Sequence, residues 1–133
     1  MQKDFDAWNE KKKQIDSRQL DFSFREGDVH WAHLGLNIGH EENGKGRTAR
    51  RPILILKKFS NNLAYVVPVT TQFKDTPYYL PFVRRIPGKN YSLLECVMLS
   101  QAKAMSSKRF DIKIGWVEQK ELERIKEALK ATL

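Results

Sequence analysis

Two short segments hold the side chains that could do chemistry. Gly39–Gly44 reads Gly-His-Glu-Glu-Asn-Gly and supplies an imidazole and two carboxylates, and Arg50–Pro52 supplies two guanidinium groups. Glutamate and histidine exchange protons near neutral pH, and arginine binds phosphate through two parallel hydrogen bonds. Cleavage of RNA without a metal needs such a set: a base for the 2′-hydroxyl, an acid for the 5′-oxygen and a cation for the phosphorane-like transition state. From spacing alone, a chance clustering of these residues stays an open alternative.

Motifs for other chemistries are missing from the sequence. It holds no Walker loop, dinucleotide fingerprint, Gly-x-Ser-x-Gly elbow or His-Glu-x-x-His zinc motif. The single cysteine, Cys96, excludes an internal disulfide and a cysteine-based zinc site. His30 and His33 are expected on opposite faces of a strand, so we predict one packed and one surface histidine that do not share a metal. We therefore expect neither a metal nor another cofactor.

The basic residues are concentrated in one stretch. The chain of 133 residues has 24 Lys and Arg against 16 Asp and Glu, a net charge of +8. Residues 43–74 include no acidic side chain, and their basic residues are Lys45, Arg47, Arg50, Arg51, Lys57, Lys58 and Lys74. Such a stretch favours a polyanionic partner: nucleic acid, an acidic protein or a membrane surface. We assign RNA binding to Lys45, Arg47, Arg50 and Lys57; ordinary solubilising surface is the alternative.

The hydrophobic pattern predicts a small β-protein with a helix at each end. Residues 1–25 are polar with a few apolar side chains at helical spacing, which predicts an N-terminal helical arm beside a domain over residues 26–133. A long loop is predicted over 35–50, and strands at Val29–His33, Ile53–Leu56, Leu63–Thr70, Tyr78–Val83, Leu93–Leu99 and Arg109–Trp116. Ile53–Leu56 is apolar on both faces, as in a central strand, whereas Pro68 indicates an edge or a bend.

The C-terminal segment has a different period. In Glu118–Leu133, three apolar residues share one helical face. Opposite charges stand three residues apart at Glu121–Arg124, Glu123–Lys126 and Glu127–Lys130. The sequence thus predicts a mainly β fold, a small antiparallel β-barrel closed by a C-terminal amphipathic helix. Because the longest apolar run is short and the first residues lack a secretion signal, we expect no membrane span and a cytoplasmic protein.

Five short motifs, in the right order, resemble the MazF/PemK toxins, the mRNA-cleaving components of bacterial type II toxin–antitoxin systems. Gly27–Trp31 resembles the family's first strand, Gly39–Glu41 its Gly-(Ser/His)-Glu loop, and Arg51–Ile55 its Arg-Pro-Val-Val-Ile strand. Pro68–Thr71 resembles its Pro-Val-Thr-Ser segment. Ser100-Gln101 with Lys108-Arg109 resembles its Gln-(Ile/Leu)-Arg-Thr-Ile-x-x-x-Arg stretch. The resemblance covers residues 27–133, and the five loose motifs are specific together.

The resemblance implies a fold, an activity and partners. The fold is an SH3-like β-barrel of the MazF/PemK/CcdB type, which forms a homodimer. The activity is that of a metal-independent, sequence-selective endoribonuclease, which cuts single-stranded mRNA to 2′,3′-cyclic phosphate and 5′-hydroxyl ends. The implied partners are RNA in a groove at the dimer interface, a cognate acidic antitoxin protein that occupies the groove, and operator DNA bound by the toxin–antitoxin complex.

When the family's functional residues are matched to positions of this sequence, the resemblance implies catalytic roles for four side chains. Arg51 matches the family's catalytic arginine, with a structural ion pair as its alternative role, and Thr70 matches its catalytic threonine. His40 and Glu41 match its substrate-contacting loop. The further residues to which we assign RNA contacts are Thr71, Gln72, Gln101 and Lys103.

The sequence departs from the family pattern at three positions. Some PemK-type members use an Arg and an Asp just before the glutamine as acid and base, and Met98 and Ser100 stand there instead. Neither can serve as acid or base at pH 7, so the proton transfer falls to Glu41 and His40. Lys103 replaces a family arginine, which keeps the charge and loses the planar fork. The alternative function is a non-catalytic module on the same fold that binds nucleic acid or poisons gyrase.

Overall fold

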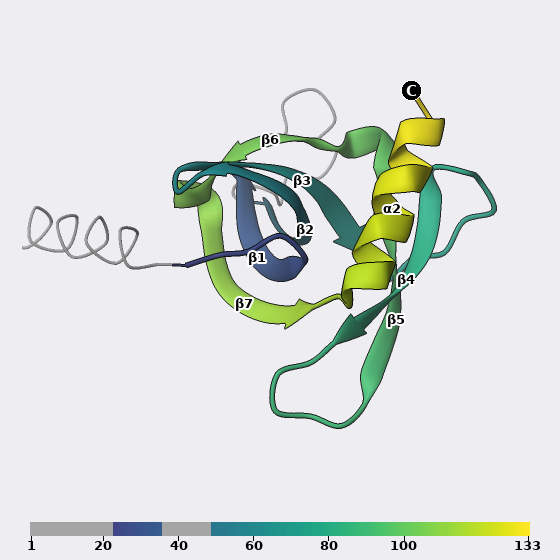
Figure 1. Cartoon of the computed structure of the whole chain (residues 1–133), viewed down its shortest axis with the longest axis horizontal. Helices are drawn as coiled ribbons and strands as arrows, with labels where there is room; N and C mark the ends of the chain where they lie inside the picture. The colour runs from purple at the N-terminus through teal and green to yellow at the C-terminus, as the bar shows by residue number, and fades with distance from the viewer. Residues whose placement is uncertain (1–22, 36–48) are drawn as a thin grey trace, which may run out of the picture.

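The computed structural model describes residues 23–35 and 49–133, which form one antiparallel sheet and a C-terminal helix (Figure 1). The N-terminal helical arm predicted over residues 1–25 lies almost wholly outside these residues. The strands are β1 (Asp28–Gly35), β2 (Ala49–Ser60), β3 (Leu63–Thr70), β4 (Tyr79–Arg85), β5 (Ser92–Met98), β6 (Lys103–Ser106) and β7 (Phe110–Trp116). The helix is α2 (Gln119–Ala131), and two short 3₁₀ turns, η1 (Leu99–Gln101) and η2 (Ser107–Arg109), flank β6.

The seven strands close into a barrel. Their order is β2-β1-β7-β4-β5-β3-β6, and an additional pairing of β2 with β3 joins the ring. On its other edge β3 pairs first with β6, up to Val66, and then with β5, from Val69. Pro68 lies between these two ladders, where the strand changes its neighbour, as expected for a residue that cannot donate a backbone hydrogen bond.

The apolar run of β2 faces two cores. Ile53 and Ile55 pack with Phe24 in one cluster of buried residues, whereas Leu54 and Leu56 pack in a second one. All four side chains are at most 2% exposed, which confirms the prediction of a central strand that is buried on both faces. The second cluster is covered by α2, through buried residues of the helix face predicted from the sequence.

The helix α2 also covers the place where the ring of strands has the fewest backbone pairings. β4 and β7 pair only at Arg85 and Trp116, which leaves the edge of β4 partly open. Side chains of α2 bond to that edge: Glu121 Oε2 accepts from the backbone N–H of Val83 at 2.8 Å, and Arg124 Nη2 donates to the carbonyl of Pro81 at 2.7 Å. Polar backbone groups that no strand reaches are thereby satisfied by the helix.

Most of the predicted elements are confirmed, with differences of one or two residues at their ends; the exception is β2, which extends four residues beyond the predicted Ile53–Leu56 at each end. Three corrections stand out. β2 begins at Ala49 instead of Ile53, because His33 and Gly35 of β1 pair with Arg50 and Ala49 and so extend the strand into the predicted loop. β6 was not predicted. Of the three charge pairs expected on the helix, Glu121–Arg124 and Glu127–Lys130 form, while Lys126 contacts Glu26 instead of Glu123.

Candidate functional site

The ends of β1, β2 and β3 surround an open hollow of about 260 Å³, here called the Arg–Thr hollow. It is lined by Trp31, Arg50, Arg51, Pro52, Val69, Thr70, Thr71 and Glu95. Two guanidinium groups, two hydroxyls, one carboxylate and an aromatic ring therefore meet at one place. The predicted catalytic residues Arg51 and Thr70, which come from different strands, are brought together here.

Arg50 occupies the side of the hollow next to β1. Its guanidinium carbon lies 5.1 Å from the centre of the Trp31 ring, a cation–π arrangement. Its Nη2 donates to Oδ2 of Asp111 at 3.2 Å. The side chain is about half exposed, so the contacts hold the guanidinium in place and leave part of it open to a ligand.

Arg51 follows in β2, where it pairs with Ala32 of β1 and is half-buried. Within residues 23–35 and 49–133 no carboxylate forms an ion pair with Arg51, in contrast to Arg50, Arg84, Arg85 and Arg124. A structural ion pair is therefore not what holds this guanidinium among the described residues. The guanidinium of Arg51 offers a planar fork of N–H donors near the start of β2, and such a fork can bind a phosphate through two hydrogen bonds.

Thr70 is the last residue of β3. Its Oγ1 accepts a hydrogen bond from the backbone N–H of Gln72 at 3.1 Å, which fixes the hydroxyl at the strand end. Across the ladder it pairs with Cys96 of β5. Burial raises the pKa of the Cys96 thiol, so that neighbour stays protonated and unreactive at neutral pH.

Glu95 of β5 lines the hollow, and Arg84 binds its carboxylate on the interior side. Its two carboxylate oxygens accept from Nε and Nη2 of Arg84 at 2.8 and 3.0 Å, and Arg84 Nη1 donates to the carbonyl of Ile114 at 2.6 Å. Both side chains are about nine-tenths buried. A Cβ on Gly115 would come within 2.7 Å of Arg84 Cγ, so this glycine leaves the room that the arginine occupies. The pair is rigid, and it presents a carboxylate that is already neutralised by its partner.

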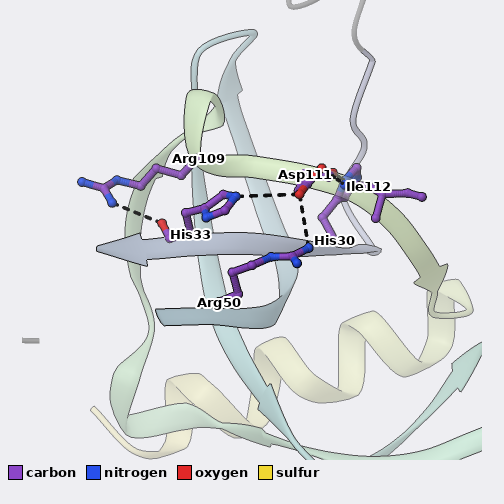
Figure 2. Close-up of polar contacts among 6 residues, drawn as sticks. All are labelled: His30, His33, Arg50, Arg109, Asp111 and Ile112. Atoms are coloured by element: carbon purple, nitrogen blue, oxygen red, sulfur yellow. Dashed lines mark hydrogen bonds and ion pairs between the residues drawn. The ribbon is translucent and has the colours of Figure 1, made fainter. Parts of the chain in front are cut away.

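A second polar group lies on the outer side of Arg50 (Figure 2). Oδ2 of Asp111 is 3.2 Å from Arg50 Nη2 and 3.7 Å from Nε2 of His33, and its Oδ1 accepts from the N–H of Ile112. The buried His30 donates from Nδ1 to the carbonyl of Asp111 at 2.9 Å. His30 is 1% exposed and His33 is exposed, which confirms the prediction of one packed and one surface histidine.

Several predicted RNA-binding residues do not line the hollow. Lys57 lies six residues beyond Arg51 on the same strand, about 20 Å away at the rise of a β-strand. Gln101 and Lys103 are exposed in η1 and at the start of β6, and Gln72 is exposed beyond the end of β3. His40, Glu41, Lys45 and Arg47 lie outside the described residues. Their predicted roles stay predictions.

The sequence did not reveal four residues of this region: Trp31, Glu95, His33 and Asp111. Glu95 had a recognisable signal, because a single carboxylate inside the apolar run Leu93–Leu99 needs a buried partner. Asp111 had none. It stands in a strand of mixed polarity and meets His33 only because β7 pairs with β1.

Among residues 23–35 and 49–133, no group of three His, Cys, Asp or Glu side chains lies close enough to hold a metal ion. The same part of the chain has no helix that is long and apolar enough to cross a membrane.

Comparison with known proteins places this chain in a family. Residues 25–133 match the family of PemK-like, MazF-like toxins of type II toxin–antitoxin systems. The chain belongs to this family and is a toxin of such a system, as the motifs of the sequence predicted.

The fold is also found in solved structures. One example is the MazE–MazF crystal structure (form II) from Deinococcus radiodurans, with a TM-score of 0.59, 19% sequence identity, and coverage of 82% of this chain and 94% of that chain. No curated protein sequence matches. The predicted MazF-like fold is confirmed.

Proposed function

We propose that this toxin is a metal-independent endoribonuclease that cuts single-stranded mRNA and leaves 2′,3′-cyclic phosphate and 5′-hydroxyl ends. The observation that supports it is the Arg–Thr hollow, where Arg51 of β2 and Thr70 of β3 meet at strand ends. Arginine forks and hydroxyl groups are the donors that hold and polarise a phosphodiester without a metal.

In the proposed reaction each group has a separate task. Arg51 neutralises the charge that develops on the phosphorane-like transition state. Thr70 and Thr71 donate hydrogen bonds to the non-bridging oxygens and orient the scissile phosphate. His40 and Glu41 contact the substrate and take part in proton transfer. The basic residues Arg50, Lys45, Arg47, Lys57 and Lys103, with Gln72 and Gln101, bind the rest of the RNA.

The proposed assembly is a cytoplasmic homodimer that a cognate antitoxin inhibits. An exposed apolar pair supports a subunit contact: Val83 and Leu94 lie directly opposite each other on β4 and β5, 42% and 59% exposed. The structural neighbour is a MazE–MazF structure, which supports an antitoxin partner. The net charge of +8 favours an acidic one and, for the complex, operator DNA.

The test is to incubate the purified protein with a long single-stranded RNA in EDTA and to map the cut sites and the end groups. We expect a limited set of cuts with cyclic phosphate on the 3′ ends. RNA that stays intact while the protein still binds it supports the alternative, a non-catalytic module. One observation favours that alternative: Met98 is buried and Ser100 is exposed, and neither can replace the acid–base pair of PemK-type members.

A further inference from the structure

His33 and Asp111 lie beside Arg50, one of the residues that line the Arg–Thr hollow. His33 is two residues beyond Trp31 on β1, so the two side chains leave the strand on the same face, and Trp31 lines the hollow. Across the ladder His33 pairs with Arg50, another lining residue, and Arg50 donates to Asp111. The imidazole and the carboxylate therefore belong to the same surface as the proposed phosphate site.

The two groups are fixed from several sides (Figure 2). Asp111 is anchored through its carbonyl by His30, through Oδ1 by the N–H of Ile112 and through Oδ2 by Arg50. The carbonyl of His33 accepts from Arg109 Nη1 at 3.2 Å. Both side chains nevertheless keep nearly half of their surface exposed, at 46% for His33 and 47% for Asp111. Ion clusters that serve only the surface add little to stability, whereas an ordered and accessible imidazole–carboxylate pair can transfer protons.

We propose that His33, oriented by Asp111, is a further proton-transfer residue of this toxin and accepts the proton of the attacking 2′-hydroxyl. This inference rests on the proposed endoribonuclease activity. Oδ2 of Asp111 lies 3.7 Å from Nε2, and a carboxylate on this side favours the tautomer that carries its proton on Nε2, with Nδ1 as the base. Asp111 is a positioning residue, because it acts through the imidazole.

The step is balanced without a metal. Nδ1 of His33 takes the proton from the 2′-hydroxyl, and the 2′-oxygen bonds to phosphorus while the bond to the 5′-oxygen breaks. The leaving 5′-oxygen takes a proton from the acid of the proposed reaction, which regains a proton from His33 through water. The products are the cyclic phosphate and the 5′-hydroxyl, with water and protein restored. Among residues 23–35 and 49–133, the charged groups next to His33 are Asp111 of β7, Arg50 of β2 and Arg109 of η2.

The test is single-turnover cleavage of one RNA in EDTA across pH 5–9, with the full chain and its variants. A base must be neutral, so the wild-type rate should rise with pH over the range in which histidine titrates. His33→Ala should lose about 10²-fold or more in rate and also lose this rise, since the base that must become neutral is gone. Added imidazole should restore part of its activity and leave Arg51→Ala unchanged. Asp111→Asn should be slower and keep the rise.

Controls separate this role from folding and from the proposed function. Lys130→Ala, at the exposed end of α2, should keep the wild-type rate and profile. His33→Gln keeps a polar side chain beside Asp111 and should be as slow as His33→Ala, with an unchanged unfolding midpoint. Wild-type cleavage together with an unchanged profile in His33→Ala, or loss of the rise in His40→Ala alone, overturns the inference and leaves the endoribonuclease standing. A wild-type protein that cuts no RNA overturns both.

Discussion

Two arginine–carboxylate pairs adjoin the Arg–Thr hollow, and they differ in burial. Arg84 and Glu95 form two hydrogen bonds in the interior, with side chains that are 10% and 8% exposed. Arg50 and Asp111 form one at the surface, with both side chains nearly half exposed. The same two chemical groups thus occur in two environments: the buried pair links β4 to β5, and the exposed pair leaves its charges open to solvent.

The largest effect is expected from breaking the buried pair. Arg84→Ala leaves the Glu95 carboxylate buried without its partner, which should lower the free energy of unfolding by about 3–5 kcal/mol. Urea unfolding at neutral pH measures this loss. The double variant Arg84→Met, Glu95→Leu removes both charges and should recover most of the stability, because two apolar side chains replace the pair. A loss below about 1 kcal/mol in Arg84→Ala would show that the pair behaves as a surface pair does.

Breaking the exposed pair should weaken RNA binding and leave the free energy of unfolding almost unchanged. Arg50→Ala should change the free energy of unfolding by no more than about 1 kcal/mol. RNA binding should weaken, and the log–log dependence of the binding constant on salt should become less steep by roughly 0.7, the value for one phosphate contact to a single strand. A salt titration in the Arg51→Ala background, where RNA stays intact, gives both quantities. An unchanged slope would mean that Arg50 contacts no phosphate.

The smallest effect is expected at a third arginine–carboxylate pair, Glu121 and Arg124, which is partly buried. Hydrogen bonding to Arg124 and to the N–H of Val83 lowers the pKa of Glu121 below its ordinary 4.5, although burial opposes the shift. A lowered pKa means that the folded state favours the carboxylate. Its contribution is complete at neutral pH and is lost as the pH falls below about 4.5 towards the folded value.

The pH dependence gives a direct measurement. Glu121→Gln should be less stable than wild type at pH 7, and the difference should shrink as the pH falls towards 3 in urea unfolding. Glu127→Gln is the matched control on the same helix, since Glu127 pairs with Lys130 at the surface, where both side chains are more than 70% exposed, and should change stability little. A difference that stays constant from pH 7 to pH 3 would contradict the assignment.

The comparison also shows what the sequence could predict. The centre of β2 and the helix α2 were predictable from their apolar residues. These residues fill both faces of the centre of β2 and one face of α2. β6 was not predictable, because Lys103–Ser106 is short and mixed and is held as a strand by its ladder with β3. Such pairing is a tertiary effect that overrides local preference.

The site was predictable where motifs exist and not elsewhere. Arg51 and Thr70 came from motifs, and the structure places them around one hollow. His33 and Asp111 meet across the β1–β7 ladder, far apart in sequence, so no local pattern could join them. Glu95 was visible as a carboxylate in an apolar strand, but its partner Arg84 lies in another strand whose register the sequence does not encode locally.

If the Arg–Thr hollow cleaves RNA through Arg51, wild-type protein and Arg51→Ala should cut one single-stranded RNA in EDTA at very different rates. Loss of a transition-state charge contact should slow cleavage by about 10²-fold or more, and Arg51→Lys should restore little, because lysine cannot reproduce the fork. Circular dichroism and urea unfolding should show that both variants are folded. A folded Arg51→Ala protein that cuts RNA at the wild-type rate would contradict this role of Arg51.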